Sequence, residues 1–236
     1  LGRGAMAMNT TASNNTAVGF IAFVSNTTGV QNVAVGSNSL DANTTGSNNT
    51  AVGYNALTTN TTGTRLTSFG VGSLNANTTA NDNTAVGYEA LYDNTTGASN
   101  TALGDSCLAN NTTGVNNIAV GHEALDANTT GYSNLAVGLS ALGACTTGVQ
   151  NTAFGYNTLG ALTTANNNVA VGYSALAANT SGTLNCAVGL NTLLANTTGS
   201  NNVGMGYAAL QANTTASNNT AVGYAALIAN TTASHN

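Results

Sequence analysis

The stretch NTAVGYEALYDNTTGAS, residues 83–99, returns almost unchanged as NTAVGYAALIANTTASH at residues 219–235. A glycine in this stretch recurs every 17 residues along the chain, without one insertion. We number the repeat so that this glycine is position 5, which gives a partial repeat at residues 1–14 and, at residues 15–236, thirteen full repeats followed by one residue. So strict a period predicts a single repeat array, a solenoid, over residues 1–236. The glycine column consists of Gly2, Gly19, Gly36, Gly53, Gly70, Gly87, Gly104, Gly121, Gly138, Gly155, Gly172, Gly189, Gly206 and Gly223.

Each repeat alternates large apolar and small residues before a polar turn. Position 4 is always large and apolar, position 9 is mostly leucine, position 2 is threonine or apolar, and positions 3 and 5 are small. Because side chains alternate along a strand, positions 2 and 4 share one face of an extended segment. The sequence N-T-T-G from position 12 is typical of a turn. We predict an all-β fold, a β-solenoid or parallel β-roll, with a strand near positions 1–6, a shorter one near positions 8–11 and a rise of about 4.8 Å per coil.

Two features of the repeat leave alternatives open. A helical turn at YEAL, residues 88–91, competes with the second strand, because Glu, Ala and Leu favour helix. The small face at positions 3 and 5 has two interpretations. Glycine supplies a positive φ at a bend, or the small side chains let another backbone come close. The second interpretation predicts that another chain covers this face, which favours an oligomer.

The composition excludes several classes of function. Only 4% of residues are charged, and the two cationic side chains are arginines, so a nucleic-acid-binding surface is not expected. No apolar run approaches the roughly 20 residues of a membrane-spanning helix. The three cysteines have no paired spacing, and no set of residues resembles a metal or catalytic site. We therefore expect no enzyme activity, no metal and no cofactor.

Position 12 starts an N-x-[S/T] acceptor for N-linked glycans in most repeats. The structural alternative is that Asn and Thr make a good turn, which duplication then copied. The low charge of the surface favours a glycan coat, because sugars would solvate the coils. Threonines at positions 13 and 14 are O-linked alternatives. The candidate asparagines are Asn9, Asn26, Asn43, Asn60, Asn77, Asn94, Asn111, Asn128, Asn179, Asn196, Asn213 and Asn230; Cys145 and Leu162 break the series.

Three further columns have mainly structural interpretations. Asparagine at position 1 recurs from Asn15 to Asn219 and fails only at Leu66, which predicts an amide ladder along the stack. Tyrosine at position 6 forms a rim or packing column rather than a stripe that binds sugar, because other residues replace it freely. Arg65 and Asp82 share position 17 of successive repeats and are expected to form a surface ion pair.

The segment NVAVG at residues 32–36 and 168–172, followed by YSALAAN at residues 173–179, resembles the head repeats of trimeric autotransporter adhesins. Similar Asn/Thr/Gly-rich repeats occur in phage tail-fibre-like proteins. The resemblance covers nearly the whole chain and implies a parallel β-roll, often trimeric, in a surface fibre. The family repeat is three residues shorter, and the excess here falls in the N-T-T turn.

These observations favour a structural subunit or segment of an extracellular fibre or filament, coated with glycans. The alternatives are a stalk module of an adhesin or phage tail fibre that binds a surface receptor, and an ice-binding solenoid. We expect the chain to lie outside the cell or on a cell or virion surface. We expect self-association, end-to-end and also lateral or trimeric, because neither end of the sequence has a polar cap.

Overall fold

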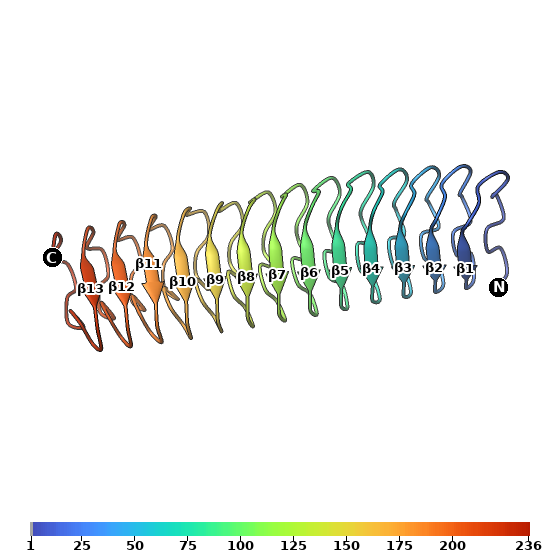
Figure 1. Cartoon of the computed structure of the whole chain (residues 1–236). Helices are drawn as coiled ribbons and strands as arrows, with labels where there is room; N and C mark the ends of the chain where they lie inside the picture. Colours follow the sequence, from blue (N-terminus) through green and yellow to red (C-terminus); the bar gives the residue numbers. More distant parts are fainter. Residues whose placement is uncertain (1) are drawn as a thin grey trace. The chain divides into compact units, whose positions relative to one another are not determined.

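The computed structural model describes residues 2–236 of the chain, and within this range it contains strands and turns but no helix. Every strand has three residues and occupies positions 2–4 of its repeat. The predicted all-β solenoid is therefore confirmed (Figure 1). The strands are β1 (Thr16–Val18), β2 (Val33–Val35), β3 (Thr50–Val52), β4 (Thr67–Phe69), β5 (Thr84–Val86), β6 (Thr101–Leu103), β7 (Ile118–Val120), β8 (Leu135–Val137), β9 (Thr152–Phe154), β10 (Val169–Val171), β11 (Cys186–Val188), β12 (Val203–Met205) and β13 (Thr220–Val222).

The chain forms two compact units, an N-terminal unit Leu1–Asn116 and a C-terminal unit Asn117–Asn236. The N-terminal unit holds β1–β6, and the C-terminal unit holds β7–β13. Inside each unit, every strand pairs in parallel with the strand of the next repeat. The register is 17 residues throughout, as for Ala17 opposite Ala34 and Ala170 opposite Ala187. Each residue therefore lies beside its equivalents in the neighbouring coils.

The predicted second strand at positions 8–11 is wrong, and so is its helical alternative. Those positions form turns, and positions 7 and 9 have left-handed backbones, as at Glu89 with φ +49° and Leu91 with φ +55°. A strand and a right-handed helix both require negative φ, so neither passes through these residues. The first strand is also shorter than predicted, because it ends at position 4, just before the glycine of position 5.

Each strand turns its small middle residue inward and its larger neighbours outward. Ala102 in β6 is fully buried, whereas Leu103 beside it is 47% exposed. The core is filled from the turn instead, by a column of fully buried leucines at position 9 such as Leu91 and Leu108. The prediction that another chain covers the small face is therefore wrong. That face lines the inside of the coil, where a strand-borne leucine would compete for space with the leucine of position 9.

The glycine of position 5 serves both roles considered for it. From Gly19 to Gly223 its φ lies between +123° and +145°, a region that side chains disfavour. The next coil also passes very close: a Cβ on Gly155 would lie 2.5 Å from the carbonyl oxygen of Gly172. The approaching backbone belongs to the following coil of the same chain.

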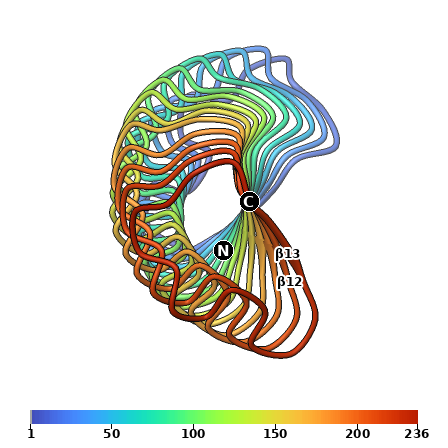
Figure 2. The same cartoon turned by 90° about the vertical axis from the view of Figure 1, so that its left-hand side faces the viewer.

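The coils of each unit are not stacked squarely. In the C-terminal unit, drawn from green to red, each coil is turned slightly from the one before it, and the N-terminal unit shows the same progression from blue to green (Figure 2). Such a stepwise rotation is the usual twist of paired strands. A column of equivalent side chains therefore winds around its stack and does not lie on a flat plane.

Position 17 offers a test of the backbone conformation. Leu184 occupies this position with φ +59° and is 56% exposed, whereas the next repeat has Asn201 at φ +57°. A leucine in the left-handed region is disfavoured by about 1 kcal/mol or more, and asparagine tolerates it better. We expect Leu184→Asn to raise the free energy of unfolding by about 1 kcal/mol, measured by chemical denaturation. The reverse exchange, Asn201→Leu, should lower the free energy of unfolding by a similar amount. Equal stability of both variants and the parent chain would contradict a left-handed backbone at position 17.

Candidate functional site

Position 12 carries a ladder of asparagine amides inside the coils. Asn94 Nδ2 donates to Asn77 Oδ1 at 3.0 Å and to the carbonyl oxygen of Gly97 at 2.9 Å. Asn111 Nδ2 then donates to Asn94 Oδ1 at 2.8 Å. The C-terminal unit repeats the pattern, since Asn196 Nδ2 donates to Asn179 Oδ1 at 2.9 Å. Each amide thus joins its own turn to the preceding coil.

This ladder consists of the residues that the sequence offered as N-glycosylation sites. Ten of the twelve candidates are 0% exposed, and Asn9 and Asn230 are partly exposed. An N-linked glycan attaches to Nδ2, the atom that here donates two hydrogen bonds inside the coil. The fold therefore argues against N-linked sugar at the buried positions, because a glycan there would displace the ladder. A ladder asparagine followed by two turn threonines gives the same N-x-[S/T] pattern without any sugar.

The predicted ladder at position 1 is confirmed. Asn151 Nδ2 donates to Asn134 Oδ1 at 3.3 Å and to the carbonyl oxygen of Ala165 at 2.8 Å. The backbone N–H of Asn151 donates to the same Asn134 Oδ1 at 3.0 Å. Where leucine interrupts the column, the backbone bond persists, since Leu66 N–H donates to Asn49 Oδ1 at 3.0 Å. The ladder satisfies backbone groups that would otherwise be buried without partners.

Cys145 and Leu162 replace two successive asparagines of the position 12 ladder, and both are fully buried. Burial raises the pKa of the Cys145 thiol to about 11, so this thiol stays protonated at neutral pH. The threonines of positions 13 and 14 persist in both repeats although the asparagine is lost. They are therefore retained independently of the N-x-[S/T] pattern.

The two threonine positions differ in what their hydroxyl groups do. At position 13 the hydroxyl bonds the next coil, as when Thr95 Oγ1 donates to the carbonyl oxygen of Thr112 at 3.0 Å and Thr146 Oγ1 donates to that of Thr163 at 3.2 Å. At position 14 the side chain is exposed, as at Thr96 and Thr147. Because each stack twists (Figure 2), the exposed residues of position 14 follow a winding line along the stack.

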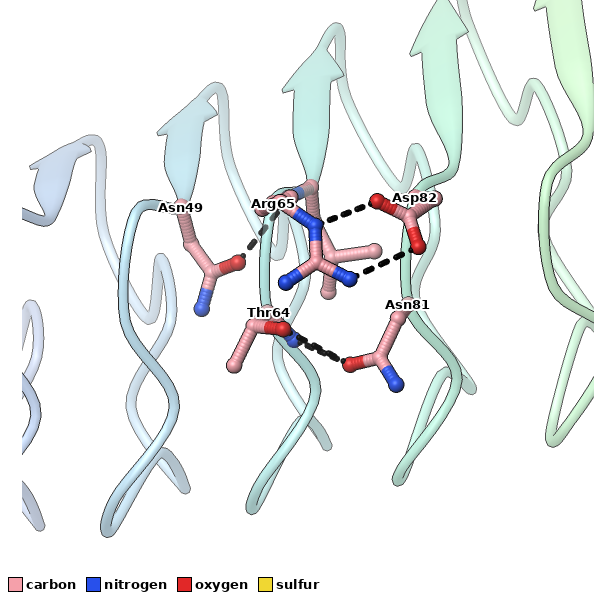
Figure 3. A network of polar contacts seen from close by, with 6 residues as sticks. Asn49, Thr64, Arg65, Asn81 and Asp82 are labelled. Carbon is pink, nitrogen blue, oxygen red and sulfur yellow. Dashed lines mark hydrogen bonds and ion pairs between the residues drawn. The ribbon is translucent and has the colours of Figure 1, made fainter.

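The predicted pair of Arg65 and Asp82 is confirmed on the surface of the N-terminal unit (Figure 3). The contact is bidentate, with Arg65 Nε 2.5 Å from Asp82 Oδ1 and the terminal nitrogen Nη2 2.9 Å from Oδ2. The hydrogen bond from Arg65 lowers the pKa of the Asp82 carboxyl group. Beside this pair, the Thr64 N–H and hydroxyl both donate to Asn81 Oδ1, at 2.7 and 2.9 Å. The cluster joins two neighbouring coils of the N-terminal unit.

Large apolar and aromatic side chains lie on the outer face of the strands. We define the outer strand face as positions 2 and 4 of each repeat, on both sides of the buried position 3; position 6 follows beyond the bend at the glycine of position 5. Phe69 in β4 is 56% exposed and Phe154 in β9 is 54% exposed, both at position 4. At position 6 the rings of Tyr156 and Tyr173 stack with centroids 4.9 Å apart. Rings that pack against each other have fewer free faces for a sugar, which agrees with the predicted rim column.

The described residues, 2–236, enclose no pocket and hold no group of three or more His, Cys, Asp or Glu placed to bind a metal. Within the same range, no helix is long and apolar enough to cross a membrane. Neither a family model, nor a curated protein, nor a solved structure matches the chain. The candidate functional features of this molecule are therefore its coil-to-coil ladders and its outer strand face.

Proposed function

We propose that the chain is a structural segment of an extracellular fibre or filament. The observation that carries this proposal is the way in which each coil uses its interior. The alanines of position 3 pair in register with those of the next strand, the leucines of position 9 are buried inside the coils, and the amides of positions 1 and 12 bond the amides of the preceding coil. Their common effect is to extend a stack of constant cross-section, which is the mechanical task of a fibre.

The surface composition supports the same proposal. Charged residues make up 4% of the chain, so little of the surface is available for selective electrostatic recognition. Asn, Thr, Ser and Gly recur instead on the turns of every repeat. A surface this uniform along the stack suits a spacer better than a site for one small ligand.

A glycan coat remains part of the proposal, at other side chains than the asparagines. The hydroxyl groups of position 14 point to solvent, and this position is threonine in every full repeat but one, where Ser181 replaces it. O-linked sugar on these residues would solvate the stack without displacing the internal amides. The adjacent threonines of position 13 are poorer acceptors because their hydroxyl groups bond the next coil.

The test is to locate the chain in its source and examine the assembly that contains it. Antibodies against the folded coils should decorate a fibre along its length on intact, unpermeabilised cells or particles. Fibre diffraction of the purified assembly should show a repeat of about 4.8 Å along the fibre axis. Labelling only after permeabilisation, or a repeat that is absent from the fibre axis, would contradict the proposal.

A further inference from the structure

Tyrosines at position 6 form two stacked pairs in the C-terminal unit. The rings of Tyr156 and Tyr173 have centroids 4.9 Å apart and planes inclined by 16°. The rings of Tyr207 and Tyr224 have centroids 5.1 Å apart and planes inclined by 11°. In each pair the two residues belong to successive repeats, 17 positions apart in the sequence. Two phenol rings are therefore held face to face at two places along the stack.

The backbone keeps the two tyrosines of a pair in register. The N–H of Gly172, which precedes Tyr173, donates to the carbonyl oxygen of Phe154 at 2.8 Å. The N–H of Ser174, which follows Tyr173, donates to the carbonyl oxygen of Tyr156 at 3.0 Å. Equivalent bonds flank the second pair. The spacing of the rings is thus set by the register of the coils.

The four rings are also open to solvent. Position 6 follows the bend at the glycine of position 5, so these side chains lie on the surface beyond the strand. Their exposed fractions are 44% for Tyr156, 54% for Tyr173, 47% for Tyr207 and 80% for Tyr224. Reagents in solution therefore reach both rings of a pair without any opening of the fold.

We propose that Tyr156 with Tyr173, and Tyr207 with Tyr224, are sites of oxidative cross-linking between successive coils. The oxidant is hydrogen peroxide, used by a peroxidase that removes one electron at a time. Each phenol loses one electron and its hydroxyl proton, which gives two phenoxyl radicals. The radicals join through a carbon–carbon bond between the ring carbons next to the hydroxyl groups. The hydrogen on each of these carbons then moves as a proton to the oxygen of its own ring, which restores both phenols as dityrosine. The two electrons and two protons removed reduce one hydrogen peroxide to two waters.

The stacked geometry favours coupling inside a pair. In solution, two short-lived radicals on different molecules would first have to meet. Here the second ring is already in contact with the first, so the reaction is intramolecular and its effective concentration far exceeds that of a dilute chain. Exposed side chains change rotamer within picoseconds to nanoseconds, so the rings can leave the stacked arrangement for the bonded one on their solvent side.

The cross-link would close a loop of 17 residues between neighbouring coils. Such a link restricts the unfolded chain, as a disulfide does. We therefore expect the cross-linked chain to unfold at a higher urea concentration than the untreated chain. The cross-link is independent of the fibre proposal, because it would strengthen any stack of these coils.

Tyr54 supplies a matched control. It is also at position 6 and is 53% exposed, close to the 54% of Tyr173, but the equivalent residues of the adjacent coils are Ser37 and Val71. Tyr54 therefore has no position 6 ring in the adjacent coils with which to couple. Tyr156→Phe keeps a ring in the stack but removes one phenol, so the link to Tyr173 should be lost.

The measurement is peptide mapping by mass spectrometry after brief treatment of the dilute chain with peroxidase and hydrogen peroxide. The fraction examined has the monomer mass of 23.1 kDa. The parent chain should give two linked peptide pairs, each lighter by two hydrogen atoms than its separate peptides. Tyr156→Phe should lose one link and keep the other. Val71→Tyr, which places a phenol beside Tyr54, should add a link in the N-terminal unit.

Several outcomes would overturn the proposal. These are a parent chain without dityrosine, links formed only between chains, and links that involve Tyr54 as often as the paired tyrosines. A Val71→Tyr chain that folds, as circular dichroism will show, but forms no new link would also overturn it. So would the absence of both linked peptides from the chain recovered from its source, because the sites would then be unused there.

Discussion

Replacing Gly172 with alanine is expected to lower the free energy of unfolding by about 3 kcal/mol or more. Two costs add at this residue. Its φ is +129°, where an L side chain is strained by about 1–3 kcal/mol. In addition, the new Cβ would lie 2.5 Å from the carbonyl oxygen of Gly189 in the next coil. Relief of that overlap requires the two coils to move apart, which weakens the hydrogen bonds between them.

Gly223 provides the control that separates the two costs. Its φ is +128°, almost the same as that of Gly172, but a Cβ there meets no other atom within 4 Å. Gly223→Ala should therefore show only the backbone strain, and Gly172→Ala should be clearly less stable when both are unfolded in urea. Equal losses in the two variants would mean that the close approach of successive coils contributes nothing.

Replacing Asn94 with aspartate is the second substitution with a large expected effect. At neutral pH it should lower the free energy of unfolding by about 3 kcal/mol or more. Asn94 is fully buried, and its Nδ2 donates to Asn77 Oδ1 and to the carbonyl oxygen of Gly97. In Asn94→Asp, a carboxylate oxygen would face these two acceptors with no hydrogen to donate. The variant would thus hold a buried charge next to two oxygen atoms.

The loss of unfolding free energy in Asn94→Asp should increase as the pH rises. Burial and the two acceptors favour the protonated acid, so the pKa of the introduced carboxyl group in the folded state would lie above its unfolded value of about 3.9. Below that unfolded value both states are protonated, and the penalty is smallest. As the pH rises, the unfolded state ionises first, so the penalty grows until the pH passes the folded pKa. The difference in melting temperature from the parent chain should therefore widen from about pH 3 to pH 7.

Asn94→Leu is the matched control for the charge. Leucine occurs naturally at the same repeat position as the fully buried Leu162, so a coil of this kind accommodates the side chain. The free energy of unfolding of this variant should be about 1–3 kcal/mol lower than that of the parent chain, because the two acceptors lose their donor. Its loss should not change with pH. If Asn94→Asp and Asn94→Leu showed the same loss and the same pH profile, burial of the amide ladder would be refuted.

The repeat period was enough to predict the parallel solenoid, its 17-residue register and the amide ladder of position 1. Alternation alone could not show which face of the strand lies inside. The face of positions 2 and 4 and the opposite face of position 3 are both plausible inner faces. The answer depends on the leucine of position 9, whose backbone at Leu91 has φ +55°. A left-handed leucine is too unusual for a single sequence to indicate. This left-handed backbone brings the leucine side chain into the core and excludes the predicted second strand.

The second amide ladder was missed because Asn94 and its equivalents also fit a modification motif. A signal against that interpretation was present in the sequence. The threonines after Cys145 and Leu162 persist without an asparagine to modify, so they do not require it. Asparagine also recurs at position 12 almost as regularly as at position 1, where the sequence predicts a ladder.

The amides of both ladders point the same way, and this gives each stack a direction. Asn94 Nδ2 donates to the preceding coil through position 12, and Asn151 Nδ2 does so through position 1. Their dipoles therefore add along the stack, as peptide dipoles do along a helix, and each bond polarises the next. One side of every coil offers amide hydrogens, and the other offers amide oxygens. A coil that is turned over would bring like groups together, so growth of the stack accepts only one orientation.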